Sequence, residues 1–135
     1  MDITKAIAIS AAGMDAQTER LRVIAENLAN QDSSGSSPGA DPYRRKTITF
    51  ADRLDRELGV DKVGVRAVGT DKADFRLKYD PSHPAADAQG YVKLPNVNPF
   101  VEIMDMREAQ RGYSANLNVM EVTRTMLTRT IELLK

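Results

Sequence analysis

The chain has 135 residues, of which 41% are hydrophobic and 28% are charged, and it contains no cysteine. This length and composition are typical of one domain-sized chain rather than a multidomain enzyme. Lysine plus arginine and aspartate plus glutamate both number 19, so the formal net charge of zero provides no general attraction for nucleic acid or for an anionic membrane surface. The absence of cysteine excludes disulfides and thiolate metal sites.

Residues 1–30 predict a long amphipathic helix. Asp2 can cap its start, while Asn27 and Asn30 lie near its end, where asparagine tolerates the left-handed conformation that stops a helix. The first residues lack the strongly cationic start and leucine-rich center of a secretory signal, so we expect no cleaved peptide and no membrane insertion. Six of eight positions spaced alternately by four and three residues are apolar, as in a heptad seam: Ile3, Ile7, Ser10, Met14, Gln17, Leu21, Ile24 and Leu28.

The middle of the chain predicts a loop followed by a small β-rich module. Residues 31–42 are turn and coil formers, which indicates a flexible loop. Within residues 43–97, polar and apolar side chains alternate at 46–50, 63–67 and 75–79, as in strands, with turns at 69–71, 80–84 and 88–90. Leu54 and Leu58 also predict a short helix before Gly59.

Residues 98–135 predict a second long helix. Asn98 can cap it, Pro99 suits the first helical position and Glu102 suits the first turn. Eight of its ten heptad positions are apolar: Ile103, Met106, Gln110, Tyr113, Leu117, Met120, Arg124, Leu127, Ile131 and Leu134. Beside this heptad seam lies a second apolar stripe, formed by Val119, Val122, Met126 and Leu133. Together the two stripes make the apolar face of the helix wider than one partner helix can cover.

The predicted fold class is α+β and mainly helical. Residues 1–30 and 98–135 form a coiled-coil-like antiparallel pair, and residues 43–97 form the β-rich module. Because such a pair leaves a wide apolar surface, we expect assembly with copies or relatives of the chain. The expected assembly interface comprises Ile3, Ile7, Met14, Leu21, Ile24, Asn27, Leu28, Asn30, Tyr113, Asn116, Leu117, Val119, Met120, Val122, Met126, Leu127, Ile131 and Leu134.

Two features of the predicted helices have alternative interpretations. Gly13 and Gly112 lie inside the helices, either to allow close backbone approach or as neutral variation. Polar residues interrupt both seams, either to fix register or because the true stripe drifts at 3.6 residues per turn so that they face water. These residues are Ser10, Gln17, Gln110 and Arg124.

No catalytic, cofactor or metal site is predicted. His83 lies between Asp80 and Asp87, but it is the sole histidine and its place between two prolines favours a role in structuring a turn. Asp71 and Asp74 lack the remaining ligands of an EF-hand loop. We therefore expect no enzyme activity.

Residues 43–46, with one tyrosine and three cations, are the candidate nucleic-acid segment. Three cations in a neutral chain are too few for a phosphate-tracking groove. A solvated strand edge is the expected role of Arg44, Arg45 and Lys46, and in an assembly the same cluster could meet an acidic patch on a neighbor.

Several motifs carry a family resemblance. Residues 20–30, RLRVIAENLAN, resemble the asparagine-containing motif shared by the flagellar axial proteins of the rod and hook, and residues 42–46 resemble the next segment in one branch of that group. The ordered series at 79–84, 90–92, 95–98 and 111–116 is similar to the proximal-rod branch, and the likeness covers nearly the whole chain. Residues 31–33 depart from it, because relatives carry a second asparagine and a threonine there.

The resemblance implies a structural subunit of the bacterial flagellar basal-body rod, helically assembled across the periplasm and transmitting torque from motor to hook. It implies export by the flagellar type III apparatus without a cleaved signal. Its implied partners are copies of itself, other rod proteins and the adaptor that joins the rod to the membrane ring. The alternatives are a distal-rod type of axial protein or a small coiled-coil adaptor unrelated to flagella.

Overall fold

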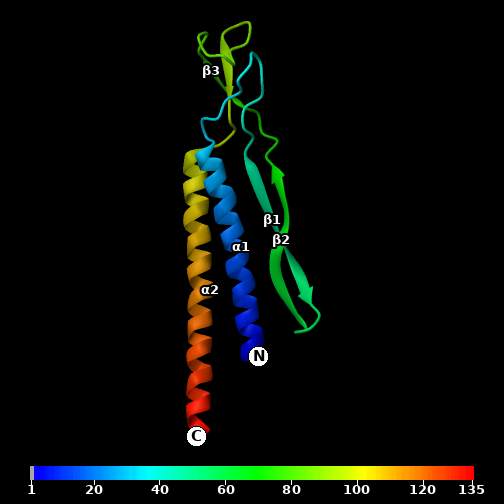
Figure 1. Cartoon of the computed structure of the whole chain (residues 1–135), viewed down its shortest axis with the longest axis vertical. Coiled ribbons are helices and arrows are strands. Elements are labelled where there is room, and N and C mark those ends of the chain that lie inside the picture. The colour runs from blue at the N-terminus through cyan, green and yellow to red at the C-terminus, as the bar shows by residue number, and fades with distance from the viewer. Residues whose placement is uncertain (1) are drawn as a thin grey trace. The chain divides into compact units, whose positions relative to one another are not determined.

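The computed structural model describes residues 2–135 and has an α+β fold with two long terminal helices, which confirms the predicted class. Two two-stranded sheets, β1–β2 and β3–β4, lie between the helices in sequence. The elements in chain order are α1 (Ile3–Ala29), β1 (Lys46–Asp55), β2 (Val60–Thr70), β3 (Arg76–Tyr79), β4 (Tyr91–Leu94) and α2 (Pro99–Leu133) (Figure 1).

The chain divides into two compact units, both of which include parts of α1 and α2. Unit 1 comprises Met1–Leu21, Ile48–Ala67 and Met106–Lys135. Unit 2 comprises Arg22–Thr47 and Val68–Asp105. Residues 43–97, predicted as one module, are thus shared between the two units.

Within unit 1, α1 and α2 run side by side in opposite directions (Figure 1). A Cβ atom on Gly13 would lie 2.7 Å from Asn116 Nδ2, and one on Gly112 would lie 3.1 Å from Gln17 Nε2. Both glycines therefore allow a close approach of the two helices, which decides between the two interpretations of these residues. Ser10 is 3% exposed and Gln17 is half-buried, so these two polar residues do not face water, whereas Gln110 and Arg124 are exposed.

Unit 2 contains the second sheet and a turn that carries side-chain hydrogen bonds. β3 and β4 pair in antiparallel register, with Tyr79 opposite Tyr91 and their rings in an edge-to-face contact at 5.4 Å. In the connecting turn, His83 Nδ1 accepts a hydrogen bond from the Ala85 backbone N–H, and its Nε2 lies 3.1 Å from Ser34 Oγ. His83 structures this turn, as predicted.

The prediction of a short helix at Leu54 and Leu58 is wrong. β1 continues to Asp55, and the chain then turns through residues 56–59. The Asp55 carboxylate accepts hydrogen bonds from the backbone N–H groups of Glu57 and Leu58, and Gly59 takes a φ of 62°. These turn interactions outweigh a helical spacing supported by only two leucines.

Two strand boundaries also differ from the prediction. β2 extends to Thr70, through part of the turn expected at 69–71, and the strand β4 was not predicted. β4 buries a single side chain, Val92, so its alternating pattern is too short to recognise in the sequence. Among residues 2–135, no helix combines the length and apolar character needed to cross a membrane.

Candidate assembly surface

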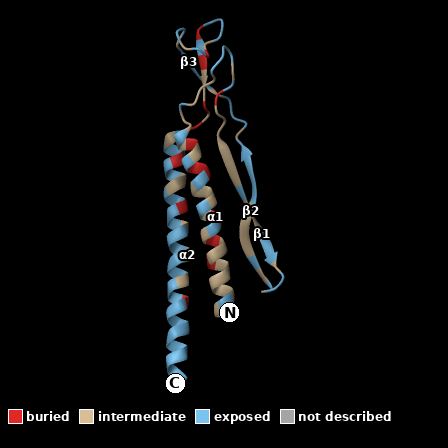
Figure 2. Ribbon diagram, in the orientation of Figure 1, coloured by how far each residue is buried: buried red, intermediate tan, exposed pale blue. Residues whose placement is uncertain are grey.

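The last part of α2 has no buried residue. Thr123 is 8% exposed, and every residue from 124 to 135 is exposed (Figure 2). This segment nonetheless carries five large apolar side chains, exposed by 39 to 87%: Met126, Leu127, Ile131, Leu133 and Leu134. Solvated apolar side chains in such a concentration are typical of a partner site.

The register of the two helices explains why α2 is uncovered there. Gly13 meets Asn116 and Gln17 meets Gly112, so four residues forward on α1 correspond to four residues back on α2. Extending this register places the first helical residue, Ile3, opposite Met126. The seven helical residues after Met126, about 10 Å of helix, therefore project past the start of α1.

A second uncovered stripe runs along one side of α2. Val119, Val122, Met126 and Leu133 are spaced by three, four and seven residues, so they lie on one side of the helix. Their exposed fractions are 50, 59, 60 and 87%. The other exposed members of the predicted interface on α2 are Tyr113, Leu117, Leu127, Ile131 and Leu134, while Asn116 and Met120 are half-buried.

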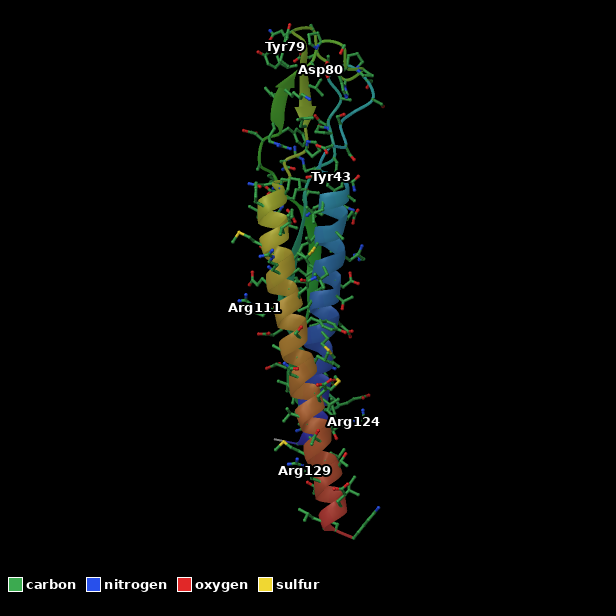
Figure 3. The ribbon with its side chains drawn as sticks, turned by 90° about the vertical axis from the view of Figure 1, so that its left-hand side faces the viewer. Tyr43, Tyr79, Asp80, Arg111, Arg124 and Arg129 are labelled. Atoms are coloured by element: carbon green, nitrogen blue, oxygen red, sulfur yellow. The ribbon has the colours of Figure 1, made fainter. Side chains whose placement is uncertain are left out.

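Three arginines extend from the polar part of the α2 surface. Figure 3 shows Arg111, Arg124 and Arg129 directed outward from the helix. All three are exposed, and none forms an ion pair within residues 2–135. The apolar stripes are therefore bordered by solvated charge, as the rim of an interface is.

The predicted interface residues of α1 are more enclosed than those of α2. Ile24 is 4% exposed and Asn27 is 1% exposed, so both lie in the interior of unit 2. The remaining members are half-buried: Ile3, Ile7, Met14, Leu21, Leu28 and Asn30.

Asn27 uses its whole side-chain amide inside unit 2. Its Oδ1 accepts hydrogen bonds from the Tyr43 hydroxyl at 2.8 Å and from the Lys46 backbone N–H at 2.9 Å. Its Nδ2 donates to the Lys46 carbonyl at 2.9 Å and to Glu102 Oε2 at 3.4 Å. This asparagine therefore joins the end of α1, the segment before β1 and the start of α2.

Glu102 is fully buried and is paired with Arg45. Arg45 Nε donates a short hydrogen bond to Glu102 Oε1, while its Nη1 and Nη2 lie 3.4 Å from Asp71 and 3.6 Å from Asp105. Burial alone would lower the pKa of Arg45, but the hydrogen bond to Glu102 and the charges of Glu102 and Asp71 raise the pKa overall. The buried carboxylate is thus neutralised by a permanently charged partner.

Tyr43, labelled in Figure 3, joins the same network through its hydrogen bond to Asn27. Burial raises the pKa of its hydroxyl, and the charges of Glu26 and Glu102 raise it further. The hydroxyl therefore stays protonated and continues to donate to Asn27. We call the side chains of Asn27, Tyr43, Arg45 and Glu102 the junction network.

The predicted solvated role is wrong for Arg44 and Arg45, which are half-buried, whereas the side chain of Lys46, at the first residue of β1, is 39% exposed. Arg44 Nη1 donates to the carbonyls of Asp71 and Ala73, and its guanidinium lies 4.2 Å from the center of the Phe75 ring. Lys46 pairs with Glu26. Arg45 and Lys46 pair with carboxylates of their own chain, which the sequence could not indicate for Arg45 because Arg45 and Glu102 are 57 positions apart.

No group of three or more metal-ligating side chains occurs within residues 2–135. What the fold does present is a long helix with uncovered apolar stripes beside a polar junction that is satisfied internally. These features define a structural subunit of a larger assembly.

Comparison with known proteins identifies the kind of assembly. A family model described as "Flagellar basal body rod FlgEFG protein C-terminal" matches residues 88–133. A flagellar basal-body rod protein FlgC of Agrobacterium fabrum is 51% identical over 133 residues, which are 98% of this chain and 96% of the relative. The FlgC proteins of Aquifex aeolicus and Borreliella burgdorferi are 41% and 36% identical, with at least 97% of each chain covered.

The chain belongs to the FlgC family of flagellar basal-body rod proteins. It is a structural rod subunit of the bacterial flagellum and is located in the basal body. The motif that includes Asn27 thereby gains a physical explanation, because this residue is the center of the junction network.

Proposed function

We propose that this rod subunit assembles helically through its terminal helices, with α1 and α2 paired as a coiled coil and the uncovered stripes of α2 covered by neighboring subunits. One observation carries the proposal: residues 124–135 keep five large apolar side chains exposed, and the last seven residues of α2 extend past the start of α1. Apolar burial contributes roughly 25 cal/mol per Å², so covering these side chains favours assembly.

The proposed partners are other copies of the chain, other rod proteins and the adaptor that joins the rod to the membrane ring. We propose that the chain reaches the rod through the flagellar type III export apparatus, carries no enzyme activity and transmits torque from motor to hook. The antiparallel helix pair and the junction network support this role, since both resist rotation of one helix against the other.

The interface residues are tested by placing a charge in the uncovered end of α2. Ile131→Glu changes a side chain that is 50% exposed, so the isolated chain folds as before. We expect loss of swimming in soft agar and loss of the chain from purified basal bodies, because a buried unpaired carboxylate opposes assembly.

Thr128→Glu is the matched control, since it places the same charge at an exposed polar position three residues earlier. We expect this variant to swim normally. Normal swimming of the Ile131→Glu variant, with unchanged expression, would contradict the proposed role of the uncovered stripe.

A further inference from the structure

The loop of residues 31–42 is tied to the turn between β3 and β4, and both segments belong to unit 2. We call residues 80–87 the histidine turn; it begins at Asp80, which is labelled in Figure 3. Ser34 Oγ lies 3.1 Å from His83 Nε2, and the Gly39 backbone N–H donates to the Ala85 carbonyl at 3.3 Å. Ala85 is only 2% exposed, so the loop is anchored to a buried residue of the turn.

Both ring nitrogens of His83 take part in this connection. Nδ1 accepts a hydrogen bond from the Ala85 backbone N–H at 3.0 Å. A ring nitrogen that accepts carries no proton, so the imidazole is neutral and its proton lies on Nε2. Nε2–H therefore donates to Ser34 Oγ. A single tautomer of the neutral ring thus joins the loop to the turn.

Protonation of His83 is incompatible with this arrangement. The added proton binds Nδ1, and both nitrogens of the imidazolium are then donors. Nδ1–H would face the Ala85 N–H, so two donors would oppose each other and their hydrogen bond would be lost. A buried N–H without an acceptor is unfavourable, and moving the ring away from Ala85 also separates it from Ser34.

The charged group that interacts with His83 within the turn is Asp80. Hydrogen bonds from Ser82 are the main cause that lowers the pKa of Asp80, and the charges of His83 and Lys78 lower it further. Asp80 thus attracts the charged ring, whereas the Ala85 N–H repels it. The remaining charged side chains of the loop and the turn are Asp32, which is exposed, Asp41, which pairs with Lys93, and Asp87, which accepts from the backbone N–H groups of Gln89 and Tyr91.

We propose that His83 is a proton-operated latch, which holds residues 31–42 on the histidine turn while the ring is neutral and releases them when the ring is protonated. Histidine side chains change charge between about pH 5 and 8. The loop is therefore ordered at the upper end of this range and mobile at the lower end. The latch lies within unit 2 of one chain, so it does not depend on the proposed assembly.

The purified full-length chain, free of any histidine tag, allows a direct test because His83 is its only histidine. NMR of the ring nitrogens reports the tautomer, and backbone relaxation gives the order parameters of Ser34 and Gly35. At about pH 8 we expect the Nε2–H tautomer and order parameters near 0.85. At about pH 5 we expect the imidazolium and values below about 0.6, while the buried Val92 of β4 stays near 0.85.

His83→Asn is the matched variant, because its Oδ1 can accept from the Ala85 N–H but its side chain does not titrate. We expect the order parameters of its loop to be equal at the two pH values. A pH dependence like that of the unmodified chain would overturn the proposal, since another group would then be the sensor.

The unmodified chain tests the latch even where the variant does not fold. An Nδ1–H tautomer at about pH 8 would overturn the proposal, and so would an ordered loop beside a protonated ring at about pH 5. Loss of order at Val92 together with the loop would overturn it as well, because the whole of unit 2 would then respond to pH.

Discussion

The two ends of α2 follow opposite rules, although they belong to one continuous helix. At the start, Glu102 is buried and paired with Arg45, and its carboxylate also meets Asn27. At the end, every residue after Thr123 is exposed, including Leu133 and Leu134 (Figure 2). The start buries a charged side chain against partners from its own chain, whereas the end buries no side chain within the chain.

This difference separates two sources of stability. A buried polar network is stable when all its members are satisfied, and it then fixes one geometry. A helix end without tertiary contacts is held only by its own backbone hydrogen bonds, which are marginal for short segments in water. We therefore expect substitutions at the start of α2 to change the stability of the isolated chain and substitutions at the end to change assembly.

The largest expected effect on stability comes from Glu102→Ala. Removing this carboxylate leaves the Arg45 guanidinium without its closest buried partner, and breaking a buried pair from one side costs about 3–5 kcal/mol. Urea unfolding of the purified chain, followed by circular dichroism, measures the change. Glu108→Ala is the control, because this side chain is 69% exposed beside Arg20 and we expect a loss of less than about 1 kcal/mol. Equal losses for the two variants would contradict the role of the junction network.

A smaller loss is expected from Asn27→Ala. The substitution leaves the Tyr43 hydroxyl and the Lys46 backbone groups without their partner, at a cost of about 1–3 kcal/mol. The same unfolding measurement applies. Asn118→Ala removes an exposed amide from a helix, so we expect it to be neutral or slightly stabilising. An unchanged midpoint for Asn27→Ala would show that water replaces these bonds without cost.

The sequence predicted the parts of the fold that depend on local periodicity. Asn98 and Pro99 marked the start of α2, and the structure places the cap there, with Asn98 Oδ1 accepting from the Phe100 backbone N–H. The apolar spacing of residues 3–28 likewise predicted α1. Both signals lie within a few turns of the elements that they define, and propensity and capping act over that range.

The junction network was not predictable, because it joins residues that no local pattern relates. Arg45 and Glu102 come from a segment before β1 and from the first turn of α2. Each has an ordinary local explanation, as a strand-edge cation and as a first-turn acid. Only the tertiary structure shows that the two charges are partners, and the burial of Glu102 results from that pairing.

The smallest expected effect on stability concerns Val122→Ser at the uncovered stripe. Val122 is 59% exposed, so the substitution changes the free energy of unfolding of the dilute chain by no more than about 0.5 kcal/mol. Val23→Ser is the matched comparison, since Val23 is also a helical valine but is only 2% exposed. We expect Val23→Ser to lower the free energy of unfolding by about 2 kcal/mol or more, because a buried hydroxyl replaces packed methyl groups.

In motile cells we expect Val122→Ser to reduce incorporation of the chain into basal bodies even though its stability is unchanged. A loss of stability equal to that of Val23→Ser would show that the stripe is already covered within the isolated chain, and the contrast between the two ends of α2 would then no longer hold.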